Sequence, residues 1–163
     1  MPAMTERIHE FPTLVTRILG PTLSSNNLRQ VAWEHRANLF DTVMWENQVV
    51  RVKVEVDLHD SILSVTIATL DAPGEEFPLW LVLWATGGSE AEARSLDKLT
   101  YDVGQTDEDC AEAALIRAAP VLAGAASPLL SGDFSLVPSL RRANQLRMEA
   151  NVRHEPWPNL TAT

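Results

Sequence analysis

The stretch VVRVKVEVDLHDSILSVTIATL, residues 49–70, alternates apolar and polar residues, turns, and alternates again. Because successive side chains of a strand point to opposite faces of a sheet, each run predicts a strand with one buried and one solvated face. The residues expected on the buried face are Val50, Val52, Val54, Val56, Leu58, Leu63, Val65 and Ile67. The two runs therefore predict an antiparallel hairpin whose valine-rich face lies against the core.

Matching the apolar faces also predicts the register of this hairpin and of the one before it. The expected opposed pairs are Val56 with Val65 and, upstream, Trp45 with Val50. These pairs centre two-residue turns on residues 60–61 and 47–48. A slip by one residue would move the apolar set to the wrong face, so such registers are excluded. Neither turn contains Asn-Gly or Asp-Gly, and the turn types stay open.

A further apolar run, FPLWLVLWATGG at residues 77–88, follows a polar loop. As a strand it would place three leucines on one face and Trp80, Val82 and Trp84 on the other. Apolar residues on both faces predict a strand that is covered on both sides, or one whose second face is a site. Pro78 fits only the first position of such a strand, because proline cannot donate a hydrogen bond to the ladder.

The segment before the hairpins, residues 28–39, fits two structures. Leu28, Val31 and Ala32 have helical spacing, whereas Val31 and Trp33 have strand spacing. We favour the helix, which leaves four strands for the sheet.

Local signals predict helices on either side of the sheet. Pro12 suits the first turn of a helix that ends at Gly20. Two capping boxes, in which a Ser or Thr precedes an acid by three residues, predict further helix starts at Ser89 and Thr106. The helix after Thr106 is expected to kink near Pro120, where the backbone hydrogen bond is lost.

The order of these elements predicts the fold class. A last helix is expected to begin near residues 133–135, and the tail from about residue 153 is expected to be frayed. We therefore predict an α+β fold: an antiparallel four-stranded β-meander with an N-terminal helix and C-terminal helices packed on one face. The 163 residues are expected to form a single domain.

The composition is that of a folded, acidic protein. Hydrophobic residues make up 45% of the chain, and the formal net charge is -9. Negative charge disfavours nucleic acid and anionic lipid as partners and favours a basic protein. One cysteine, no apolar stretch of membrane-spanning length and no signal-peptide core predict a cytoplasmic location without a membrane span. Arginine far exceeds lysine, which indicates a GC-rich bacterial gene.

The sequence contains none of the short signatures of catalysis that we sought. It has no glycine-rich phosphate loop, no G-x-S-x-G elbow, and no histidine with a His or Cys neighbour at metal-ligand spacing. We therefore predict no catalytic residue, no cofactor and no metal site.

Three polar groups allow a chemical interpretation, and for each we favour a structural one. Cys110 follows three acids in the first turn of a predicted helix. The helix dipole can lower the pKa of a thiol there, but the neighbouring acids raise it. We therefore favour a buried core residue over a nucleophile. His59 and Asp60 are either an acid–base pair or a solvated hairpin tip. Asp102 and the acids at residues 107–109 either bind a cation or cap a helix.

Two sets of residues are candidates for binding a protein partner. Trp80 and Trp84 share a face, which is core if a helix covers it and a flat apolar docking surface if the cover is partial. The charged face of the first hairpin strand either is solvated or docks a partner by charge complementarity. The residues of that face are Arg51, Lys53, Glu55 and Asp57.

Three functions follow from these observations. The favoured one is a non-enzymatic bacterial protein-binding module of the immunity, chaperone or adaptor kind, which acts through a sheet face or its acidic surface. An enzyme or small-molecule-binding domain would need a pocket between the sheet and a helix, with Trp80, Trp84, Tyr101 and His59 as candidate residues. A structural component would oligomerise, for instance as a homodimer, through an edge strand or the C-terminal helix.

Overall fold

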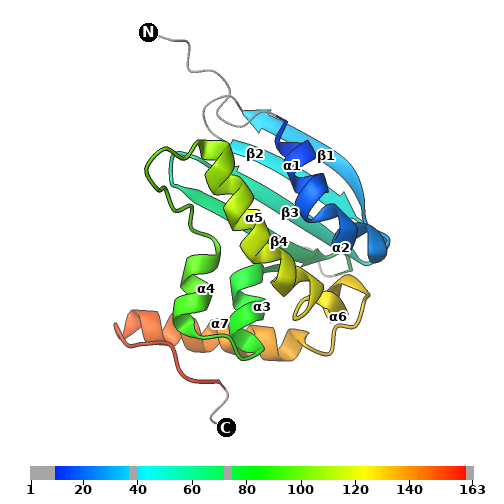
Figure 1. Ribbon diagram of the computed structural model, residues 1–163. Coiled ribbons are helices and arrows are strands. Elements are labelled where there is room, and N and C mark those ends of the chain that lie inside the picture. Colours follow the sequence, from blue (N-terminus) through cyan, green and yellow to red (C-terminus); the bar gives the residue numbers. More distant parts are fainter. Residues whose placement is uncertain (1–9, 37–39, 72–74, 161–163) are drawn as a thin grey trace.

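The computed structural model describes residues 10–36, 40–71 and 75–160 (Figure 1). Within these ranges an antiparallel meander of five strands follows the order of the sequence. The strands are β1 (Arg29–Arg36), β2 (Phe40–Glu46), β3 (Val50–Asp57), β4 (Ile62–Thr69) and β5 (Glu76–Pro78). The helices are α1 (Phe11–Ile18), α2 (Gly20–Ser25), α3 (Leu79–Ala85), α4 (Glu90–Leu96), α5 (Asp107–Ala123), α6 (Ser127–Leu130) and α7 (Val137–Val152). The predicted α+β fold is confirmed, with five strands instead of four.

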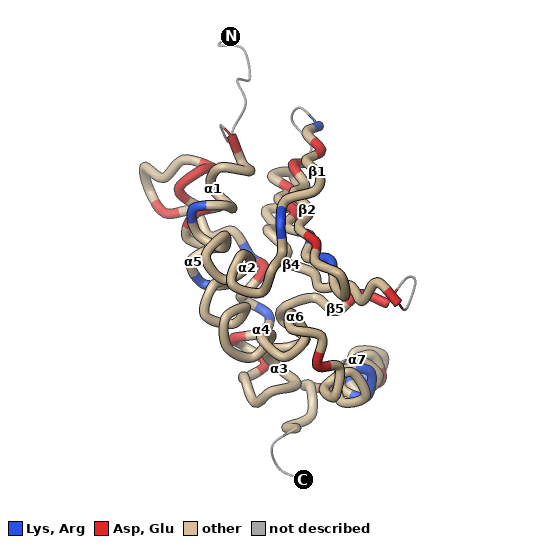
Figure 2. Tube along the Cα trace, turned by 90° about the vertical axis from the view of Figure 1, so that its right-hand side faces the viewer, with Lys and Arg blue, Asp and Glu red and all other residues tan. Residues whose placement is uncertain are grey.

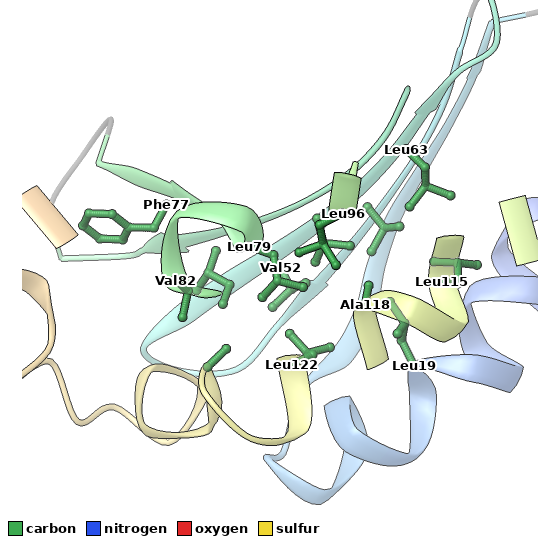
Figure 3. Close-up of a cluster of buried hydrophobic side chains, with 14 of the residues drawn as sticks. Leu19, Val52, Leu63, Phe77, Leu79, Val82, Leu96, Leu115, Ala118 and Leu122 are labelled. Atoms are coloured by element: carbon green, nitrogen blue, oxygen red, sulfur yellow. The ribbon is translucent and has the colours of Figure 1, made fainter. Parts of the chain in front are cut away.

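One face of the sheet is covered by helices. Figure 1 shows α1, α2 and α5 lying across this face, with α3, α4 and α7 beyond one end of the strands. Figure 2, turned by 90°, shows the second face pointing away from α1, α2 and α5. The core lies between the sheet and these helices, and its buried side chains include Val52 of β3 and Leu115, Ala118 and Leu122 of α5 (Figure 3). The alternation in residues 49–70 thus produces the two faces that it predicts.

The valine-rich side of the central hairpin is buried as predicted. Val50, Val52, Val54 and Val56 are each at most 1% exposed, and the apolar residues of β4 at positions 63, 65 and 67 are equally hidden. Leu58, the eighth residue expected there, lies in the turn and is half-buried. Burial of such an aliphatic side chain stabilises the fold by about 1.5–3 kcal/mol.

The predicted register of the β3–β4 hairpin is wrong by two residues. Val56 opposes Leu63, so residues 58–61 form a longer turn than the expected two-residue one. Asp57 stabilises this turn, because its Oδ1 accepts hydrogen bonds from the backbone N–H of His59 at 2.9 Å and of Asp60 at 3.1 Å. A shift of two residues leaves every side chain on its predicted face, which is why facial matching does not detect it.

The β2–β3 register differs from the prediction by the same amount. Trp45 opposes Val52, and residues 47–49 form the turn. The Oδ1 of Asn47 accepts hydrogen bonds from the backbone N–H of Val49 and Val50, both at 2.9 Å. The N–H of Asn47 donates to the carbonyl of Val50 at 3.2 Å, so the turn is centred on residues 48–49, one residue after the predicted centre.

Residues 79–85 form helix α3, so the predicted strand at this place is wrong. Pro78 ends the short strand β5 and, with φ -64° and ψ 145°, becomes the residue that precedes the helix. Leu79, Leu81, Val82 and Trp84 of the helix are buried. A segment that is apolar on every side suits a buried helix as well as a buried strand, so periodicity alone does not distinguish them.

Residues 29–36 form the edge strand β1, so the favoured helix for residues 28–39 is wrong; residues 37–39 lie outside the described part of the chain. β1 pairs with β2 along its whole length, with a register shift between Gln30 and Ala32 that leaves Val31 as the extra residue. As a strand, this segment satisfies its backbone hydrogen-bonding groups by pairing with β2. That gain outweighs the helical preference indicated by the spacing of three apolar residues.

The other helical predictions agree with the structure apart from their ends. Both capping boxes are present, at Ser89 and at Thr106, and α1 has its proline in the first turn. α5 continues through Pro120 to Ala123. The last helix begins at Val137, two to four residues after the predicted start near residues 133–135. In the described part of the tail, residues 153–160, there is neither helix nor strand, yet Trp157 packs against the core.

Candidate partner-binding site

The charges predicted for partner binding on the open sheet face are paired within the chain. Arg51 forms an ion pair with Glu46 of β2. The Nζ of Lys53 lies 3.9 Å from the Oε2 of Glu76 in β5. The Oε2 of Glu55 accepts a hydrogen bond from the Oγ1 of Thr42 at 2.9 Å. Asp57, the fourth member of the set, binds the β3–β4 turn described above. These cross-strand contacts give the residues a role in the sheet.

Trp80 and Trp84, the second predicted set, lie one helical turn apart on α3. Trp84 is 3% exposed and belongs to the core, and Trp80 is half-buried against it. Both rings contact Trp157 of the tail, with ring centroids 5.5 Å and 4.9 Å away. Trp157 therefore packs against both rings of the flat apolar surface that was predicted as a docking site. The packing of Trp157 on α3 was not predicted, because the sequence PWP in a polar tail has no hydrophobic periodicity.

The residues considered for catalysis lie on different elements: Cys110 is in α5, and His59 and Asp60 are in the β3–β4 turn. Cys110 is buried, and burial, followed by the charges of Asp107, Asp109 and Asp102, raises the pKa of its thiol, which keeps it protonated.

His59 is exposed at a hairpin tip, where the hydrogen bond to Asp60, and then the charges of Asp60 and Asp57, raise its pKa. No group of three or more His, Cys, Asp or Glu side chains within the described ranges is placed to hold a metal ion.

The β4–β5 edge of the sheet is closed. β5 covers the second half of β4 and runs directly into α3. The first half is covered by residues 97–99: the N–H of Leu63 donates to the carbonyl of Asp97 at 2.8 Å, and the N–H of Leu99 donates to the carbonyl of Ser61 at 3.0 Å. Arg117 of α5 donates to the carbonyl of the intervening residue at 2.6 Å. Burial raises the pKa of the Asp97 carboxyl to about 7.

The opposite edge, β1, is open. β1 is eight residues long, and within the described chain only β2 pairs with it. Val31 is 47% exposed and Trp33 is 50% exposed. Trp33 opposes the buried Val43, so its side chain points to the helix-covered face of the sheet, yet it is half exposed there. An edge strand with exposed apolar residues is a template for pairing with another chain, which most folds avoid.

A polar network holds Trp33 at this edge. Asp41 of β2, only 7% exposed, contacts the Nδ1 of His35 and accepts a hydrogen bond from the Nε1 of Trp33 at 3.4 Å. The two rings lie 6.1 Å apart between centroids. A shared buried carboxylate limits the rotation of both side chains, so the exposed indole is held in a fixed position instead of moving freely in solvent.

A pocket of about 750 Å³ lies at the start of β1. Its walls come from the end of α2, the first residues of β1, the β2–β3 turn and the end of α6, and they include Arg29 and Val31. Asn47 joins these walls, since its Nδ2 donates to the carbonyls of Asn26 at 3.0 Å and Leu130 at 2.9 Å. The pocket and the open edge thus form one continuous surface, which we call the β1 site.

The sequence contains little that indicates the β1 site. Its only signal is the apolar–polar alternation of Val31 and Trp33, which was outweighed by helical spacing. Comparisons with protein-family models, curated proteins and solved structures found no match to this chain. None of the described helices is both long and apolar enough to cross a membrane.

Proposed function

We propose that this chain is a non-enzymatic protein-binding module that receives an extended segment of a protein partner along β1. The observation that carries the proposal is the open edge with half-exposed Val31 and Trp33. The fold closes its other edge with two separate segments, so an eight-residue edge left open is a specific feature of this sheet.

Strand addition explains these properties together. Backbone hydrogen bonds to β1 supply affinity without sequence preference, and side chains that alternate along the added strand supply specificity. Trp33 offers a large apolar surface, and tryptophan is enriched among residues that dominate binding energy. Because Asp41 already holds its ring, little side-chain freedom is lost when a partner binds.

The charged outer face is the alternative docking surface. Arg51, Lys53 and Glu55 are exposed or half-exposed there, and a partner could bind them by charge complementarity. Their existing partners would have to be exchanged, which reduces the gain in free energy.

Affinity capture with matched variants tests the proposal. The bait variant V31K/W33K places two gatekeeper lysines on β1, whereas V103K adds a lysine at a fully exposed valine distant in sequence from β1. A third bait, R51A/K53A, removes two charges from the outer face. We expect the wild type, V103K and R51A/K53A baits to capture the same protein from native cells, and the V31K/W33K bait to lose it. The purified partner is expected to show the same pattern of binding to the four proteins. Equal recovery by all baits, loss only with R51A/K53A, or no specific partner contradicts the proposal.

A further inference from the structure

The charges of β1 differ from those of the whole protein. The chain has a net charge of -9, yet β1 carries Arg29 and Arg36 near its two ends and a single acid, Glu34, between them. Both arginines are exposed. Both oppose residues whose side chains lie on the outer face of the sheet, the face that helices do not cover. Seven residue steps along a strand place them about 20 Å apart.

Neither arginine has an acidic partner among the described residues. Glu46, which opposes Arg29 across the sheet, is bound instead by Arg51. The guanidinium of Arg36 lies over the ring of Phe40, 4.9 Å from its centroid. Two cations at the ends of an otherwise open strand therefore stay available to an incoming carboxylate, in a protein whose other charges repel acids.

The pocket of the β1 site lies at the Arg29 end. Asn27, Gln48 and Ser131 give it polar walls beside Arg29. Glu46 also lines the pocket, and its charge is paired with Arg51. Such walls suit a short acidic side chain or a terminal carboxylate, because amides and hydroxyls donate hydrogen bonds to carboxylate oxygens. At the middle of β1 the requirement changes: Glu34 repels an acid on the open face, and Trp33 favours an apolar residue on the helix-covered face.

We propose that the β1 site recognises an extended peptide segment with an acidic residue at each end and alternating apolar residues between them, one acidic end entering the pocket beside Arg29. This inference rests on the proposed function and specifies the partner. It replaces a basic partner, which the overall charge favours, with one that is acidic where it meets β1.

A displayed library of random 12-residue peptides tests this specificity on the full chain. Wild type is expected to enrich Asp or Glu at two positions six to eight residues apart, with apolar residues alternating between them. The variant R29E/R36E is expected to enrich Lys or Arg at the same positions. The control R142E/R153E makes the same change in net charge at two exposed arginines distant from β1 in sequence, and it is expected to keep the acidic preference.

Synthetic peptides from the selection give the affinities. We expect R29A and R36A each to weaken binding of a selected peptide about threefold and R29E/R36E to weaken it about tenfold or more, with the difference shrinking as salt is raised. Peptides that need Val31 and Trp33 but show no acidic preference overturn this inference and leave the proposed function standing. Peptides that bind V31K/W33K as well as wild type overturn both, and so does a selection that yields no binder.

Discussion

The two edges of the sheet carry comparable aromatic residues in opposite surroundings. Phe77 of β5 and Trp33 of β1 both point to the helix-covered face, opposing Ile67 and Val43. Phe77 is 4% exposed, whereas Trp33 is 50% exposed. At the first edge the chain itself supplies the cover, from α3 and residues 97–99; at the second it does not within the described ranges. The difference shows that Phe77 contributes to the core, and it supports the proposal that Trp33 contacts a partner.

The largest expected effect separates these two aromatic residues. We expect F77A to lower the free energy of unfolding by about 3–4 kcal/mol, because it removes a buried ring and leaves a cavity. W33A is expected to lower it by less than about 1 kcal/mol, since half of its side chain already contacts solvent. Urea unfolding followed by far-UV circular dichroism measures both values. Similar losses in the two variants would remove the distinction between the edges.

The second prediction concerns Asn47, which joins the walls of the pocket at the start of β1. Asn47 donates two hydrogen bonds and accepts two, so N47A removes four bonds at once and leaves backbone groups without partners. We expect a loss of about 2–3 kcal/mol in the same unfolding experiment. N47D keeps the acceptor oxygen but not the donors, and an intermediate loss is expected. A loss below about 0.5 kcal/mol in N47A would show that the pocket walls are held by other contacts.

A pH-dependent effect sharpens the view of the closed edge. Because burial raises the pKa of Asp97 to about 7, the folded state holds a proton there that the unfolded state releases near pH 4. The contribution of Asp97 is therefore most favourable below pH 4 and is lost as pH rises to about 7. We expect D97N to be close to wild type at pH 4 and more stable by about 2 kcal/mol at pH 8. A constant difference between the two proteins across this pH range would contradict this assignment.

The smallest expected effect is at the turn of the closed edge. Ser61 has a φ of 55°, a left-handed conformation that glycine adopts without strain. S61G is expected to raise the free energy of unfolding by about 0.5–1 kcal/mol, whereas S61A, which keeps the Cβ, gives no gain. Thermal unfolding of the three proteins measures the difference. A gain in S61A equal to that in S61G would assign the effect to the hydroxyl group.

How far the sequence predicts this fold depends on whether one face of an element is solvated. β3 and β4 were predicted correctly because their apolar residues alternate with charged residues in β3 and with Ser64, Thr66 and Ala68 in β4. Residues 79–85 were not, because a segment buried on most sides has no polar residues to reveal its period. The registers were missed by two residues because Asp57 and Asn47 form side-chain turns that facial matching does not include.

The candidate site was harder to predict than the fold. Its defining property is that, among the described residues, no strand besides β2 pairs with β1, and whether a strand lies at an edge depends on the path of the whole chain. The tryptophans that seemed most suited to a partner, Trp80 and Trp84, are covered by a third, Trp157, from a tail that the sequence analysis expected to be frayed. Local patterns thus identified apolar surfaces but not which of them the fold covers.

The central claim is that the fold does not need the apolar residues of β1, whereas a partner does. Measuring two quantities on the single variant V31K/W33K, namely its free energy of unfolding and its affinity for a peptide selected on wild type, tests this directly. We expect the free energy of unfolding to stay within about 1 kcal/mol of wild type and the affinity to fall at least about tenfold. A variant that unfolds readily, or one that keeps the affinity of wild type, would contradict the claim.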